Sequence, residues 1–191
     1  MAQFVVIAMA TLVITSEYTS GSIRASLQWV PVRNRLLLAK GAVLVPVLFA
    51  LGFVLFALGT GLAAVVKGDH GPSTSIGTAL SMAVATGGYF ALLGLFCLGI
   101  GSALRSTAAS IVTMIVLIVM LPLLSASAIS AKVVDYFPGF AGVNAMTPTG
   151  EANPVFGTFS PYPHWVGLLI CAAWTAAALL AGVTVLRRRD A

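Results

Sequence analysis

The sequence predicts an all-α integral membrane protein, a single domain over residues 1–191 with five transmembrane helices. Of its 191 residues, 59% are hydrophobic and only 8% are charged, and the mean hydropathy is +1.04. Soluble domains carry about 25% charged residues. Residues 41–66, 70–104 and 106–131 contain no Asp, Glu, Lys or Arg, and each run exceeds the roughly 20 apolar residues that cross a bilayer. A water-soluble enzyme is therefore excluded.

The five spans are expected at residues 3–16, 41–66, 77–104, 107–131 and 165–186. Each should be a helix, because lipid offers no partner to backbone N–H and C=O groups. The first span is short, and we expect its helix to continue past Ser16. Pro46 and Pro122 should kink their helices. Three pairs of small residues have the four-residue spacing that lets membrane helices approach closely and should pack within the chain: Ala57 with Gly61, Gly87 with Ala91, and Ala178 with Gly182.

The basic residues predict the orientation of the chain. Segment 17–40, the turn at Arg105 and the tail 187–191 hold eight of the ten Lys and Arg, and Lys67 and Lys132 fall on the other side. Cytoplasmic loops carry the excess of Lys and Arg. We therefore expect the amino terminus outside, the carboxyl terminus in the cytoplasm, and a long outer loop over residues 132–164.

Residues 16–40 carry more information than a plain connection. Ser20 or Ser22 can cap a short helix that Pro31 ends, with apolar residues at Ile23, Leu27 and Val30. This predicts an amphipathic helix at the cytoplasmic surface, with Glu17 just before it and paired with Arg24. Two interpretations remain open from the residues alone. The helix is either a membrane-surface anchor with snorkelling basic residues or a docking element for a cytoplasmic protein.

The same segment resembles a motif of ABC-2-type transporter permeases, in particular compact actinobacterial ones. Their pattern is E-Y-x-x-G-[ST]-[IL]-R, followed by P, R and A-K, and the matching residues here are Glu17, Tyr18, Gly21, Ser22, Ile23, Arg24, Pro31, Arg33, Ala39 and Lys40. The Ala-rich last span and the tail from Leu186 to Ala191 are also similar to that family. Tyr136 to Gly139 with Ala141 and Gly142 resemble its short, partly re-entrant helices.

The resemblance implies a six-helix membrane domain whose first cytoplasmic loop is a coupling helix seated in a groove of a separate ATP-binding subunit. By this resemblance the coupling residues are Glu17, Tyr18, Gly21, Arg24 and Leu27. ATP and Mg would be bound by that ATPase partner, and the permease would form a homodimer or heterodimer. The five spans would correspond to the family's second to sixth helices, so we expect a first helix upstream of Met1 or a truncated relative.

The residues of the chain itself predict no catalytic, cofactor or metal site. There is no G-x-x-x-x-G-K-[ST] phosphate loop. His70 and His164 have no second ligand at metal spacing, and Cys97 and Cys171 are expected to be packing residues. Arg105 is interpreted as a topology marker. Trp29, Trp165, Tyr136 and Tyr162 are expected at the membrane interface. The basic residues flank apolar runs, so they predict contact with lipid and no nucleic acid.

Three functional hypotheses follow. The leading one is an exporter permease for a hydrophobic or amphipathic compound, since charge-free spans suit lipid-like cargo better than ions. The alternative is a non-transporting membrane scaffold that anchors a cytoplasmic partner through its basic segment. A membrane enzyme that uses loop histidines and acids is the third.

Overall fold

The computed structural model describes residues 2–19, 33–67, 75–128, 131–148, 150–153, 157 and 159–189. This part of the chain is helical, as predicted, apart from its connections and an isolated bridge between Ala152 and Phe159. Its elements are α1 (Ala2–Thr19), α3 (Arg33–Lys67), α4 (Ile76–Leu104), α5 (Thr107–Ile115), the π-helix η2 (Val116–Met120), α6 (Leu121–Ala128), α7 (Ala131–Val134), α8 (Pro138–Met146) and α9 (His164–Arg189).

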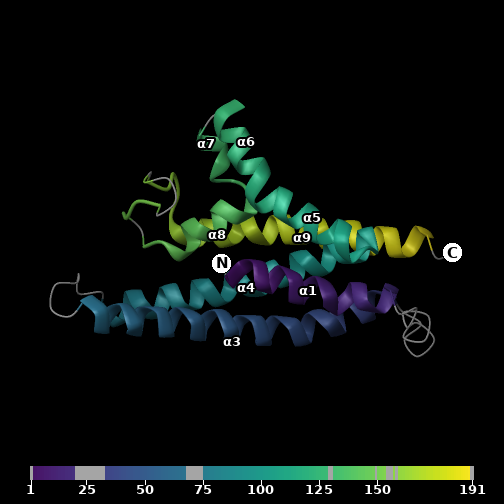
Figure 1. Cartoon of the computed structure of the whole chain (residues 1–191), viewed down its shortest axis with the longest axis horizontal. Coiled ribbons are helices and arrows are strands. Elements are labelled where there is room, and N and C mark those ends of the chain that lie inside the picture. Colours follow the sequence, from purple (N-terminus) through teal and green to yellow (C-terminus); the bar gives the residue numbers. More distant parts are fainter. Residues whose placement is uncertain are drawn as a thin grey trace.

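Four helices of the described chain are long and apolar enough to cross a membrane: Leu37–Val66, Ile76–Leu104, Thr107–Leu124 and His164–Val185. The fifth expected span is apolar but shorter. Its helix does continue past Ser16, to Thr19, but 18 residues reach only about 27 Å at 1.5 Å per residue. The first residues of α1 therefore lie part-way along the bundle (Figure 1).

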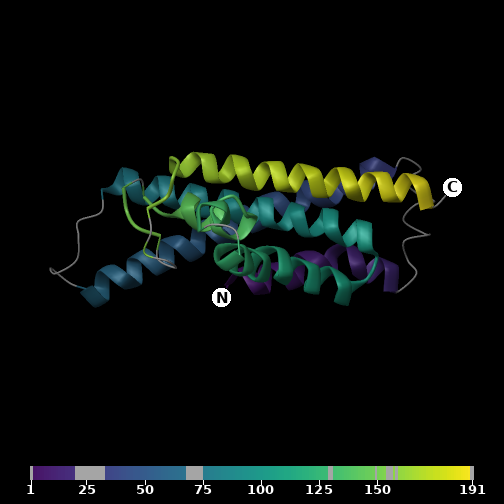
Figure 2. The same ribbon diagram turned by 90° about the horizontal axis from the view of Figure 1, so that it is seen from above.

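The long helices run along a common axis (Figures 1 and 2). The end of α1, the start of α3, the turn between α4 and α5, and the end of α9 all lie at one end of the bundle, on the right in both views. These are the segments that hold most of the basic residues, so we call this the basic end. The end of α3 and the starts of α4 and α9 lie at the opposite end.

Helix α4 is the centre of the bundle. Of its most apolar window, 72% is buried, against 22% for α3, and it packs against α1, α3 and α9. Two of the expected small-residue pairs contribute. A Cβ on Gly87 would lie 2.8 Å from Phe49 O of α3, and a Cβ on Gly182 would lie 2.8 Å from Gly99 O of α4.

The third small-residue pair does not pack as expected. A Cβ added to Gly61 would meet nothing within 4 Å, and Ala57 is exposed. The reason is that the second half of α3 lies on the outside of the bundle, where Leu58, Leu62 and Val65 are 64%, 69% and 81% exposed. Apolar side chains on such a surface are compatible with lipid.

The expected kink at Pro122 is present and has a specific form. Proline cannot donate a hydrogen bond to the carbonyl four residues earlier, Ile118 O, and its ring crowds that turn. The chain widens here into η2, in which the N–H of Leu121 bonds to Val116 O. Beyond it, α6 and α7 form an arm that projects from the side of the bundle (Figure 1). Pro46, by contrast, lies inside α3, which continues through it.

Two short helices, α7 and α8, occupy part of the segment that was expected to be an outer loop. Helix α8 starts with Pro138 in its first turn, where a proline costs no hydrogen bond. It packs on α9 and α4. Gly139 lets α8 also approach η2, because a Cβ there would collide with Ile118 O. The α8 backbone thus packs against the turn that Pro122 widens.

Candidate functional site

The first two motif residues lie in a cluster of side chains at the basic end. This motif cluster consists of Thr15, Glu17 and Tyr18 of α1, Lys40 of α3, Arg105 in the turn between α4 and α5, and Thr107 of α5. Each of its contacts joins the last turns of α1 to a different neighbouring segment. The cluster therefore ties α1 to α3, to the α4–α5 turn and to α5.

Glu17 and Lys40 form an ion pair. Lys40 Nζ lies 2.7 Å from Glu17 Oε1, and the two side chains are 14% and 23% exposed, Lys40 being the more buried. The same ammonium donates to Val13 O over 2.7 Å. Because the pair is partly shielded from water, its contribution exceeds that of a typical surface pair, at about 1 to 2 kcal/mol.

The position of Glu17 differs from the sequence expectation. It lies inside α1, near the carboxyl end, where the helix dipole disfavours an acidic side chain. The ammonium of Lys40 offsets this, since it contacts both the carboxylate and a backbone carbonyl of α1. The expected partner of Glu17, Arg24, lies outside the described residues.

Tyr18 and Arg105 form the second contact of the cluster. The guanidinium carbon of Arg105 lies 5.6 Å from the centre of the Tyr18 ring, a cation–π geometry. Arg105 also ends α4 in the left-handed region, with φ 55°, and its N–H bonds to Gly101 O. Glycine is the usual residue at such a position. An arginine held there at a backbone cost is evidence of a role for its side chain.

The third contact is a hydrogen bond between two hydroxyl groups. Thr107 Oγ1 donates to Thr15 Oγ1 over 2.8 Å, and Thr15 Oγ1 donates to Thr11 O over 2.9 Å. Ser106 caps α5 next to it, accepting from Ala109 N. The start of α5 is thus fixed to α1.

The other three predicted coupling residues, Gly21, Arg24 and Leu27, lie outside the described residues, so the predicted coupling helix stays a prediction. Sequence reasoning counted Lys40 among the basic residues and at the end of the motif but did not pair it with Glu17, and it interpreted Arg105 only as a topology marker. One signal was available for Arg105. It is the single charged residue between two charge-free runs. A charged residue in such a place is a good candidate for a contact with another segment.

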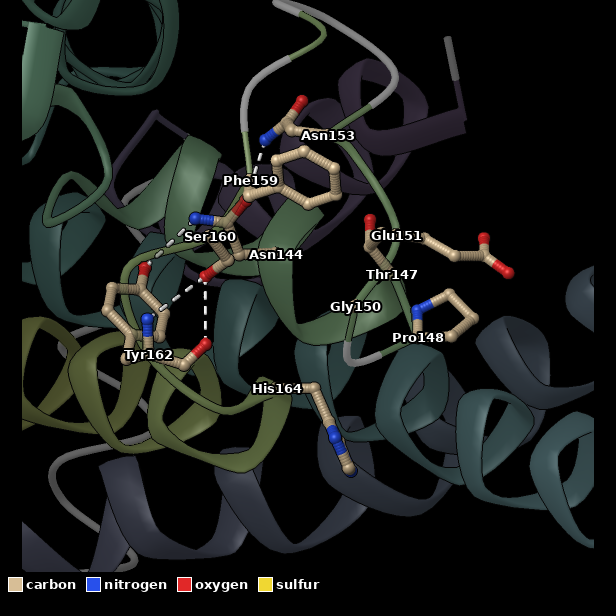
Figure 3. A pocket seen from close by; sticks show the side chains of 10 residues that line it. All are labelled: Asn144, Thr147, Pro148, Gly150, Glu151, Asn153, Phe159, Ser160, Tyr162 and His164. Atoms are coloured by element: carbon tan, nitrogen blue, oxygen red, sulfur yellow. Dashed lines mark hydrogen bonds between the residues drawn. The ribbon is translucent and has the colours of Figure 1, made fainter.

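A second polar cluster lies toward the opposite end and centres on Asn144 of α8, which is 1% exposed. Asn144 Nδ2 donates to Asp135 Oδ1 over 2.8 Å and to Tyr162 OH over 3.2 Å, and Asn144 Oδ1 accepts from Asn153 Nδ2 over 2.6 Å. Tyr162 OH donates to the backbone oxygen of Asp135. Ser160 Oγ donates to Tyr162 O over 2.9 Å. We call these residues, Ser160 included, the Asn144 network, and Figure 3 shows its members other than Asp135.

Tyr162, which is expected at the membrane interface, is also part of this network. Burial raises the pKa of Tyr162 to about 12, and the negative charge of Asp135 acts in the same direction, while the hydrogen bond with Asn144 opposes them. A neighbouring side chain, Trp174, donates to Tyr136 O over 3.0 Å and stacks on Phe137. The connections around α8 are therefore tied to α9.

The network borders a cavity of about 70 Å³, which has room for a few water molecules but is well below the 300 Å³ or more of typical small-molecule sites. Its rim includes Glu151 and His164, whose side chains point away from the hydrogen-bonded residues in Figure 3. In the part of the chain that the structure describes, no group of three or more His, Cys, Asp or Glu is placed to hold a metal. His70 lies outside that part.

Comparison with known proteins identifies one family. The sequence model of a family described as "ABC-2 family transporter protein" matches residues 2–191. No curated protein and no solved structure matches the chain.

Proposed function

Because this chain belongs to the ABC-2 family of transporter proteins, a family of membrane transport components, we propose that it is the permease subunit of an exporter driven by a separate ATP-binding subunit. Permeases of this family normally work with such a subunit. The partner would dock on the end of α1, at Glu17 and Tyr18, and on the segment that follows it, at Gly21, Arg24 and Leu27. The basic end would face the cytoplasm, as the excess of Lys and Arg favours.

The motif cluster is the observation that carries this proposal. The segment between α1 and α3 starts and ends at helices that the Glu17–Lys40 pair holds together. Force applied to that segment would reach α3 through Lys40, the α4–α5 turn through Arg105, and α5 through Thr107. A single docked partner would thus move several membrane helices at once, which alternating access requires.

The charge content of the spans supports a hydrophobic or amphipathic substrate. Among the four candidate spans, Lys40 is the one Asp, Glu, Lys or Arg in the sequence, and Glu17 neutralises it. Membrane proteins that move ions or protons usually keep ionisable side chains along the pathway. A second copy of the permease, or a related chain, would complete the transport pathway.

The test is co-expression and co-purification with a separate ABC ATP-binding subunit, followed by ATP-dependent transport in vesicles. We expect Arg24→Glu to weaken the complex at least tenfold. The charge-exchanged double variant Glu17→Lys/Lys40→Glu should keep the fold but lose the complex, because it restores the ion pair and not the docking surface. Glu151→Lys, at the opposite end, is the control and should bind normally.

An undiminished complex in both Arg24→Glu and the exchanged variant would refute the docking site. A stable complex with no ATP-dependent transport of any amphipathic compound would refute the transport function and identify a membrane scaffold instead.

A further inference from the structure

An apolar groove lies between α3 and α9, with α4 as its floor. Its volume is about 550 Å³, within the range of ligand sites. It is lined by Leu37, Leu38, Gly41, Ala42 and Val45 of α3, Leu95 of α4, and Leu179 and Val183 of α9. Every lining residue is apolar. We call it the α3–α9 groove.

The groove ends at the basic end of the bundle. Helix α3 begins at Arg33, four residues before Leu37, and α9 ends at Arg189, six residues after Val183. The two helix ends lie at the same end of the bundle in Figures 1 and 2. In the sequence these two ends carry five arginines, Arg33, Arg35, Arg187, Arg188 and Arg189. The sequence therefore concentrates positive charge at the two helix ends that follow the groove toward the basic end.

Lys40 is engaged elsewhere. Although it lies between groove residues Leu38 and Gly41 in the sequence, its ammonium contacts Glu17 and Val13 O of α1. A ligand in the groove would therefore find its positive charges at the arginine-bearing helix ends.

We propose that the α3–α9 groove binds one anionic phospholipid, with an acyl chain along the apolar lining and the phosphate at the arginines of the two helix ends. Basic pockets between membrane helices are suited to acidic lipid head groups. A second copy of the chain fits less well, because a two-fold contact brings the same patch of both copies together and would oppose one set of arginines to another. Lipid binding here requires neither ATP nor a transported compound, so its test is independent of the transport function.

The first test fills the groove. Phosphatidylglycerol and phosphatidylcholine with identical acyl chains are titrated against the purified full chain in detergent, and bound lipid is counted by native mass spectrometry. We expect phosphatidylglycerol to bind at least tenfold more tightly. Ala42→Phe, inside the groove, should weaken its binding about tenfold or more, and Ala57→Phe, exposed on the same helix outside the groove, should change it less than about twofold.

The second test removes charge. Converting Arg187, Arg188 and Arg189 together to Gln should abolish most of the preference for phosphatidylglycerol, because each basic residue near a phosphate contributes roughly a fivefold factor. Lys67→Gln, at the other end of α3, is the control and should leave the preference intact.

Equal binding of the two lipids, or equal effects of Ala42→Phe and Ala57→Phe, would overturn the proposal, since either result describes a nonspecific lipid annulus. If Ala42→Phe instead turns a dimer into a monomer and leaves phosphatidylglycerol binding unchanged, the groove is an interface between two copies and the proposal is wrong.

Discussion

The two ends of the bundle are held together by different chemistry. At the basic end, the motif cluster relies on an ion pair, a cation–π contact and a hydroxyl bond, and its charged side chains are partly exposed. The Asn144 network uses buried amide groups, one of them 1% and the other 2% exposed. Contacts between charges near water are weak and are screened by salt, whereas buried amides are costly to leave unpaired.

This difference fits the proposal that a docked partner moves the helices at the basic end. Contacts that contribute about 2 kcal/mol or less each could be broken and remade when a partner pushes on α1. A buried network whose members satisfy one another keeps α8 and its connections as one unit. Under the proposed function, the basic end would be the part that moves and the α8 region the part that stays fixed.

The largest effect is expected at the centre of the Asn144 network. Asn144→Leu would leave Asp135, Tyr162 and Asn153 without their amide partner, and we expect a loss of about 3 kcal/mol in the free energy of unfolding. Denaturant unfolding in detergent measures it. Glu151→Gln, an exposed change at the rim of the same cavity, should stay within about 0.5 kcal/mol. Similar losses in both variants would show that the network is not buried in solution.

An intermediate effect is expected for the ion pair. A double-mutant cycle of Glu17→Gln and Lys40→Met should give a coupling energy of about 1 to 2 kcal/mol at low salt that falls by half or more at high salt. The corresponding cycle of Asn144 and Asn153 should hardly depend on salt, because neither group is charged. If the coupling energies of both cycles fall equally with added salt, the proposed difference between the two ends is wrong.

A smaller effect is expected at Arg105. Arg105→Ala removes the contact with Tyr18 and keeps the unfavourable φ of 55°, so it should cost about 0.5 to 1 kcal/mol. Arg105→Gly loses the same contact but relieves the backbone, and its stability should be close to that of the unmodified chain. Thermal unfolding of the two variants side by side tests this. A glycine variant no more stable than the alanine variant would show that the turn is unstrained.

The last prediction concerns Tyr162, whose contribution to stability changes with pH only in alkali. Burial raises the pKa of Tyr162 to about 12, above the roughly 10 of an unfolded chain. The folded protein therefore holds this proton more tightly, and the associated stability is complete below pH 10 and is lost as the pH rises to 12. In alkaline unfolding titrations the stability gap between the unmodified chain and Tyr162→Phe should narrow over that range. If the difference in stability between the two chains stays constant over that range, the Tyr162 hydroxyl is exposed to water.

The sequence predicted the helices well where polarity changes sharply. The helix expected at 77–104 is Ile76–Leu104, and the one at 165–186 is His164–Arg189. Helix α3 begins at residue 33, eight residues before the expected 41. The prediction started the span just after the charged residue Lys40. The helix starts earlier because Leu36, Leu37, Leu38 and Ala39 favour helix, and because Glu17 offsets the charge of Lys40.

The polar clusters were largely beyond sequence reasoning. The partners of Asn144 lie nine and eighteen residues away along the chain. They lie in connections outside α8, so the spacing of residues within a helix does not predict these contacts. Lys40 and Glu17 are 23 residues apart on helices that only the fold makes neighbours. The motif drew attention to Glu17 and Tyr18, but their contacts with Lys40 and Arg105 depend on how α1, α3 and α4 pack.

The widened turn at Val116–Met120 also constrains how this chain can vary. A π-turn holds one residue more than the α-helical turn it interrupts, and here Pro122 favours it by withholding the hydrogen bond to Ile118 O. Because each residue of an α-helix turns the chain by about 100°, an extra residue that the turn did not absorb would rotate α6 and α7 about the helix axis by more than a quarter turn. The direction in which this arm points therefore depends on this one widened turn.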